Sequence, residues 1–282
     1  MLVVLVVLAA ALLHASWNAV AHAVPDRQVG FFLLNVAIAA VALPWLPFAG
    51  LPAAAAWPFL LGSVLVHLAY NLLLLRSYQL GDFNQVYPVA RGTAPLLVAL
   101  VGATVVGQRL DASEVAGVVT VSVGLLVLVR GRGSFSASRP AVAAALLTGV
   151  AIATYTVLDG VGVRRAHDTA GYVAWLFALQ GPLIAAVVGS RRPGLLRGCR
   201  PLLLPGLASG VVSLAAYGLV IWAQTRAQLA TVASLREVGI VFGAVIGAVF
   251  FRERFGPVRI AGAAVVFAGV LLLARGRGLA VE

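Results

Sequence analysis

Long apolar runs separated by short polar connections follow one another along the whole chain. A helix needs about 20 residues to cross a hydrocarbon core of about 30 Å, and continuous apolar runs lack the alternation of a membrane β-barrel. No basic residue precedes the first run, so we interpret it as a span rather than a cleaved signal peptide. The pattern predicts an all-α integral membrane protein with ten transmembrane helices, over residues 2–22, 29–48, 57–76, 83–106, 113–130, 141–162, 170–189, 201–223, 228–250 and 257–274.

An internal repeat divides the chain into two halves, roughly residues 1–135 and 140–278. A gapless shift of 145 positions aligns residues 79–133 with residues 224–278. Identical residues then meet at polar and glycine positions: Gln79 with Gln224, Arg91 with Arg236, Arg109 with Arg254, Gly117 with Gly262, and Gly124 with Gly269. Each half holds five predicted helices, and because five is odd the second half enters the membrane from the opposite side. Many secondary transporters use such inverted repeats to build one site near the midplane.

Composition agrees with a lipid environment and argues against nucleic acid as a partner. Hydrophobic residues make up 62% of the chain and charged residues 10%, whereas soluble domains are about half apolar and a quarter charged. The net charge of +11 comes from arginines scattered mainly through the connections and span ends. They form no basic domain that would dock a phosphate backbone.

Catalytic and metal-binding patterns are not found in the sequence. Cys199 is the single cysteine, and the four histidines lack the close spacing of a zinc or haem site on one helix. We find no Ser-His-Asp constellation, phosphate-binding glycine loop or paired carboxylates. The sequence therefore predicts neither a cofactor nor a metal, and not an enzyme.

Three stretches resemble the EamA-like members of the drug/metabolite transporter superfamily. They are HASWN at residues 14–18, GQRLDASEVAGVVTVSVGLLVLV at 107–129 and FFRERFGPVRIAGAAVVFAGVLLLA at 250–274. The second half carries Glu253-Arg254 where the family typically has a Glu-Arg pair, whereas the first half has Gln108 in place of the glutamate. The resemblance implies a ten-helix carrier with a central cavity between two EamA-like halves.

Two arginines at matching positions of the repeat are the first candidates for a substrate site. Arg91 lies nine residues after Asp82, which is about 13 Å along a helix and close to mid-membrane. Arg236 lies about as deep in the ninth predicted helix. A buried guanidinium is costly unless it faces a cavity or a partner. One alternative is that both arginines face a shared cavity and bind an anionic group. Another is that each is neutralised internally, Arg236 by Glu237 or Asp159, and locks helices together. The third is that their side chains extend to the membrane interface.

Two carboxylates are candidates for proton coupling. A low-dielectric site disfavours the charged form of a carboxylate, so Glu237 or Asp159 would take up and release protons during transport. The alternatives are a structural ion pair for Glu237 and an interfacial position for Asp159, which lies five residues before Arg164.

Aromatic and amide side chains complete the candidate substrate-binding residues. Tyr87 precedes Arg91 by one helical turn and shares its helix face. Trp17 is either a cavity residue or an interfacial anchor, and Asn18 either lines the cavity or bonds a neighbouring helix. The remaining two candidates are Tyr155 and Tyr217.

The function predicted from these patterns is secondary transport by alternating access. The substrate would be a small polar metabolite, anionic or zwitterionic, such as an amino acid or a phosphonate-like compound, carried across the inner (plasma) membrane. Alternatives are export of amphipathic or cationic compounds and movement of a lipid headgroup. The expected partners are the substrate, the lipid bilayer and protons, and the sequence does not distinguish a monomer from a homodimer.

Overall fold

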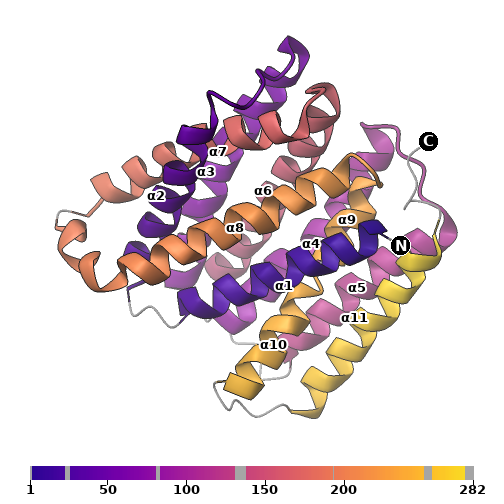
Figure 1. The fold of residues 1–282 in the computed structure, drawn as a ribbon. Helices are drawn as coiled ribbons and strands as arrows, with labels where there is room; N and C mark the ends of the chain where they lie inside the picture. Colours follow the sequence, from indigo (N-terminus) through magenta and orange to yellow (C-terminus); the bar gives the residue numbers. More distant parts are fainter. Residues whose placement is uncertain are drawn as a thin grey trace.

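Helices make up nearly all of the structure, a computed structural model that describes residues 2–22, 26–80, 83–130, 138–192, 194–250 and 256–276 (Figure 1). Within those ranges no residue lies in a strand. The α-helices are α1 (Leu2–His22), α2 (Arg27–Trp45), α3 (Trp57–Leu80), α4 (Phe83–Thr104), α5 (Ala112–Arg130), α6 (Arg139–Arg165), α7 (Thr169–Ser190), α8 (Leu203–Gln224), α9 (Leu229–Arg236), α10 (Gly239–Phe250) and α11 (Pro257–Arg275). Three short 3₁₀ helices lie between them: η1 (Ala54–Ala56), η2 (Leu195–Gly198) and η3 (Arg200–Leu202).

The described helices have the length and composition of membrane spans. Six stretches are long and apolar enough to cross a membrane: Gln28–Trp45, Ala54–Ser77, Arg139–Arg165, Thr169–Ser190, Leu203–Gln224 and Leu229–Ile246. Four shorter apolar helical stretches fall in the other predicted spans: Leu2–Trp17, Pro88–Thr104, Ala112–Leu128 and Ile260–Arg275. Large apolar side chains such as Leu5, Leu65, Leu100 and Phe267 are exposed along these helices, as expected for surfaces that face lipid rather than water.

The helix is interrupted within the predicted span over residues 228–250, of which Leu229–Ile246 is long and apolar enough to cross a membrane. This segment forms α9 and α10, which are separated by a turn at Glu237 and Val238. At the break the backbone N–H groups of Glu237 and Val238 donate to the carbonyls of Ser234 and Leu235, three residues back rather than four. Its equivalent in the first half, α4, runs unbroken from Phe83 to Thr104 although Pro88 and Pro95 lie inside it.

Four glycines hold α5 and α11 together at one side of the molecule (Figure 1). A Cβ built on Gly117 would lie 3.0 Å from the carbonyl oxygen of Gly269, and one on Gly269 would lie 3.0 Å from that of Gly117. The corresponding distances between Gly124 and Gly262 are 3.0 and 3.1 Å. Small residues of this kind let two helix backbones approach closely. The earlier glycine of each helix meets the later glycine of the other, so α5 and α11 are antiparallel.

Several helix contacts correspond to one another when the two halves are exchanged. The exchange replaces α1 to α5 by α6, α7, α8, the α9–α10 pair and α11. The packing of α3 on α6 then corresponds to that of α1 on α8, and α4 on α6 to α1 on α10. Three contacts join a helix to its own counterpart: α5 with α11, α2 with α7, and α4 with α9. In Figure 1 the α2–α7 pair lies at the side of the molecule opposite α5 and α11.

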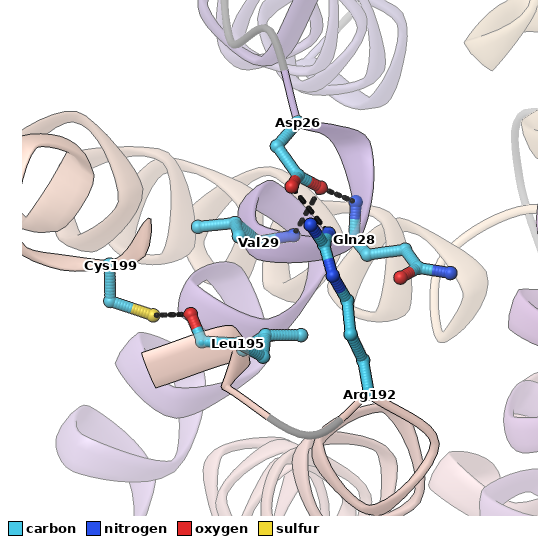
Figure 2. Close-up of polar contacts among 6 residues, drawn as sticks. All are labelled: Asp26, Gln28, Val29, Arg192, Leu195 and Cys199. Carbon is cyan, nitrogen blue, oxygen red and sulfur yellow. Dashed lines mark hydrogen bonds and ion pairs between the residues drawn. The ribbon is translucent and has the colours of Figure 1, made fainter. Parts of the chain in front are cut away.

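The second helices of the two halves are also joined by an ion pair in a connection (Figure 2). Asp26 caps the N-terminus of α2 by accepting from the backbone N–H groups of Gln28 and Val29 at 3.1 and 3.3 Å. It also pairs with Arg192, which follows the C-terminus of α7. Burial opposes the charge of Asp26, but the hydrogen bonds from Arg192 and the two backbone groups outweigh it and lower the pKa of this carboxyl. This interaction fixes α2 against α7 outside the spans.

Candidate functional site

The two matched arginines meet at one carboxylate in the interior. Arg91 Nε lies 2.8 Å from Glu237 Oε2, and Arg236 Nε lies 3.8 Å from Glu237 Oε1. All three residues are buried, with exposed fractions of 2% for Arg91, 4% for Arg236 and 0% for Glu237. Glu237 therefore contacts both guanidinium groups, one from each half of the chain. We call these residues the Arg–Glu–Arg cluster.

The broken helix places the carboxylate of this cluster. All eight residues of α9 are buried, and α9 packs against α1, α4, α5 and α8. Arg236 ends α9 and Glu237 is its C-cap. Beyond the break, a Cβ on Gly239 would lie 3.1 Å from the carbonyl oxygen of Ala11, so this glycine lets α1 approach α10 closely. Discontinuous helices of this kind supply the central sites of many transporters.

Charge is not balanced within the Arg–Glu–Arg cluster. Two guanidinium groups and one carboxylate leave one net positive charge in the low-dielectric interior. The 3.8 Å contact of Arg236 is too long for a hydrogen bond, and its buried Nε has no hydrogen-bond partner in the described part of the chain. Buried ion pairs are favourable only when the remaining donors are satisfied. The cluster thus has an unused donor and a surplus cation.

Polar contacts from both halves fix the N-terminal end of α9. Gln108 Oε1 accepts from the backbone N–H of Leu229 at 3.1 Å. The buried carboxylate of Glu114 accepts from the hydroxyl of Thr231 at 3.0 Å. Arg164 donates to the carbonyls of residues 224 and 227, just before α9. These contacts hold α9 in place before it reaches Arg236.

A second buried carboxylate lies on α6. Asp159 Oδ1 accepts from the hydroxyl of Tyr172 on α7 at 3.1 Å, and Asp159 Oδ2 accepts from that of Tyr217 on α8 at 2.5 Å. Asp159 is 0% exposed. Asp159 therefore lies inside the bundle, where its helix packs against α3, α4 and α8.

Aromatic rings gather beside Asp159. The His67 ring stacks on Tyr155 with centroids 4.0 Å apart and meets Tyr217 edge-on at 5.6 Å. Phe177 packs edge-on against Tyr217 at 5.8 Å. The Nδ1 atom of His67 lies 3.1 Å from the Ser63 hydroxyl, which fixes the ring one turn along α3. Edge-on and offset-stacked rings of this kind are mutually stabilising.

Electrostatic interactions connect this aromatic group to the Arg–Glu–Arg cluster. The charge of Arg236 acts on Tyr155, Tyr217 and Asp159. The structure therefore brings Arg91, Arg236, Glu237, Asp159, Tyr155 and Tyr217 into one buried polar region built from both halves.

The candidates near the start of the chain are only partly described. Trp17 is partly buried, and its Nε1 donates to His14 Nδ1 at 3.2 Å. His14 in turn interacts with the charges of Arg91 and Arg236, so α1 reaches the same region. The side chains of Asn18 and Tyr87 lie outside the described residues, as do Glu253 and Arg254.

Several residues of this region were missed by sequence reasoning. His67 and Ser63 are separated by one helical turn within an apolar run, and a buried polar pair at that spacing is a signal that could have selected them. Tyr172 lies near the start of α7, where tyrosine is ordinarily interfacial. The neighbouring sequence therefore gives no indication of its hydrogen bond to Asp159. In the described ranges, no three histidine, cysteine or acidic residues come together to hold a metal ion.

Comparisons with known proteins assign the fold and the family. A crystal structure described only as that of a protein aligns with a TM-score of 0.77 at 19% identity, covering 96% of this chain and 95% of that chain. At that identity the likeness shows the fold alone. No curated protein matches the chain. The model of the EamA-like transporter family matches residues 139–275. Residues 139–275 thus form an EamA-like transporter domain, the domain of a family of membrane transporters.

Proposed function

We propose that the chain is a secondary transporter that carries a small polar metabolite by alternating access. The substrate is anionic or zwitterionic, amino-acid or phosphonate-like, and it binds in a central cavity between the two halves. The membrane is the cell's inner (plasma) membrane. The observation that carries this proposal is the buried Arg–Glu–Arg cluster, which draws one arginine from each half to a broken helix.

Two inverted five-helix repeats, residues 1–135 and 140–278, form the carrier in this proposal. The antiparallel α5–α11 contact supports inversion, because it joins equivalent helices through glycines that the 145-residue shift matches. Ten crossings follow if the four shorter apolar helices span the membrane as well as the six longer stretches. A pseudo-twofold arrangement supplies two related gates around one site.

The residues of the site then take distinct roles. Arg91 and Arg236 bind the anionic group, because a guanidinium stays charged and matches carboxylate and phosphonate oxygens. Tyr155 and Tyr217 line the site with rings and hydroxyls, and Trp17, Asn18 and Tyr87 contribute from α1 and α4.

Proton coupling is assigned to Glu237 and Asp159 in this proposal. Both carboxylates are buried, which favours the neutral form, whereas the guanidinium groups beside Glu237 favour its charged form while they contact it. A proton taken up on one side of the membrane and released on the other would couple substrate movement to the proton gradient.

Export of a cationic or amphipathic compound is the second candidate function. It is favoured by Asp159, whose carboxylate lies among the rings of Tyr155, Tyr217 and His67. A carboxylate with aromatic neighbours suits an ammonium group through charge and cation–π attraction. A zwitterion would use both this region and the Arg–Glu–Arg cluster.

The test is a ligand stability screen on purified protein with amino acids, phosphonates, sugar phosphates and cationic drugs. Anionic and zwitterionic compounds should raise the unfolding temperature of the parent, because a ligand that binds only the folded state stabilises it. Arg236→Ala should lose most of this stabilisation. Arg226→Ala is the matched control, since Arg226 is an exposed arginine ten residues earlier. If anions stabilise Arg236→Ala as strongly as the parent, the arginine site is wrong, and stabilisation by cationic drugs alone would favour the second function.

A further inference from the structure

The two halves of the chain differ at the position of the cluster's carboxylate. The 145-residue shift that matches Arg91 with Arg236 places Gly92 opposite Glu237. The repeat therefore supplies two equivalent cations but one anion. A Cβ on Gly92 would meet Leu125 and Ser122 of α5 at 3.4 Å, so this position is filled by helix packing and provides no polar group.

The carboxylate of Glu237 lies closer to one arginine than to the other. Glu237 lies 2.8 Å from Arg91 but 3.8 Å from Arg236. The Nε atom of Arg236 is buried and has no hydrogen-bond partner in the part of the chain that the structure describes. A buried donor without a partner is costly, and Arg236 is only 4% exposed. Arg236 is thus the place where a second anionic group would gain most.

We infer that Glu237 is an internal counter-anion that competes with the substrate's anionic group for Arg91 and Arg236. This inference rests on the proposed function. It adds an explanation of what determines the affinity of the same site for its substrate. Glu237 neutralises part of the arginine charge, so an arriving carboxylate or phosphonate binds Arg236 first and then takes the guanidinium donors that Glu237 holds. The affinity for the substrate is lowered by the work of displacing Glu237.

The break between α9 and α10 would allow Glu237 to move away from Arg91. Glu237 is the C-cap of α9 and lies in the turn before α10. Its backbone N–H donates to Ser234 and its carbonyl accepts from Ile240, both in tight three-residue steps. Hinges of conformational change are typically a few residues at the ends of elements. Release of Arg91 would let this turn rearrange and move α10 relative to α9.

The experiment compares the affinities of the parent, Glu237→Gln and Asp168→Asn for methylphosphonate and glycine, by ligand-dependent thermal unfolding. Removal of the competing charge should tighten binding by about tenfold or more, the equivalent of one hydrogen bond to a charged group. Asp168 is the control, because it is an exposed carboxylate that accepts from the backbone N–H groups of Ala170 and Gly171 at the start of α7. Asp168→Asn should bind both probes as the parent does.

A second variant covers the case in which Glu237→Gln does not fold. Glu237→Asp keeps the charge but withdraws it by one methylene, so it should compete less and tighten binding to a smaller extent. Tighter binding by either variant supports the inference. Equal or weaker binding by the folded Glu237 variants, with the parent still binding the probes, overturns the inference and leaves the proposed function standing. If neither probe binds any of these proteins, the proposed anion site fails and the inference fails with it.

Discussion

The glycine contact between α5 and α11 gives a quantitative test of the repeat. An alanine Cβ at position 124 would lie 2.8 Å from both the backbone nitrogen and Cγ2 of Val266, and 3.0 Å from the carbonyl oxygen of Gly262. Ordinary contacts begin at 3.4 Å, so the interface must open by about 0.6 Å at a point where backbone atoms block any local adjustment. A gap of about that size forfeits a quarter or more of each dispersion contact.

Gly124→Ala should therefore destabilise the protein despite the better helix propensity of alanine. Overpacking costs about 1–3 kcal/mol, while replacing a helical glycine by alanine gains up to about 1 kcal/mol. The net loss expected from these two terms is up to about 2 kcal/mol. Gly243→Ala in α10 is the control, because nothing lies within 4 Å of its added Cβ, and it should be neutral or slightly stabilising.

The matching glycine of the second half makes the test specific for the repeat. A Cβ on Gly269 would lie 2.7 Å from Cγ2 and 2.8 Å from the backbone nitrogen of Val121, nearly the same contacts as those of Gly124. Gly269→Ala should therefore match Gly124→Ala. The double variant should lose less than the sum of the two, because both substitutions open the same interface.

The assay is denaturant unfolding of the detergent-solubilised protein, followed by tryptophan fluorescence. Equal stabilities of Gly124→Ala and Gly243→Ala would show that α5 and α11 do not touch at these glycines. A loss in Gly124→Ala without a loss in Gly269→Ala would contradict the twofold relation between the halves.

Two further predictions concern the carboxylates. Because the pKa of Asp26 is lowered in the folded protein, its pair with Arg192 should stabilise the fold above the ordinary carboxyl pKa and lose that contribution as the pH falls below it. Asp26→Asn should therefore flatten the acid side of a curve of stability against pH. An unchanged curve would contradict the ion pair. Tyr217→Phe should lower stability by about 1–3 kcal/mol, since it removes the donor at 2.5 Å from a buried oxygen of Asp159; a loss equal to that of a surface Tyr→Phe substitution would contradict the contact.

Much of the architecture could be predicted from the sequence because its signals are local or periodic. Apolar runs long enough to cross a bilayer identified the helical segments within a few residues, since burial in lipid demands such runs. The 145-residue shift singled out the four glycines that join α5 to α11. The family resemblance read from the end of the second half is confirmed by the match over residues 139–275.

The details of the site depend on contacts between distant segments and could not be read locally. Glu237 lies next to Arg236 in sequence, yet its short contact is with Arg91, 146 residues away. The helix break at Glu237 interrupts an apolar run that predicts one continuous helix, because the close approach of α1 to Gly239 is a tertiary contact. The hydrogen bond from Tyr172 to Asp159 likewise joins two helices, and no local sequence pattern predicts that these helices pack together.

Thiol accessibility inside the bundle tests the central claim most directly, namely that the buried polar region opens to water during transport. Tyr155→Cys and Leu235→Cys, each in a Cys199→Ser background, would be exposed in membranes to a charged, water-soluble methanethiosulfonate reagent. Both positions are buried, with exposed fractions of 4% and 0%, but Tyr155 belongs to the proposed cavity and Leu235 to the apolar core. The account predicts modification at position 155 and none at position 235. An unreactive cysteine at position 155, or equal reaction at both positions, would contradict it.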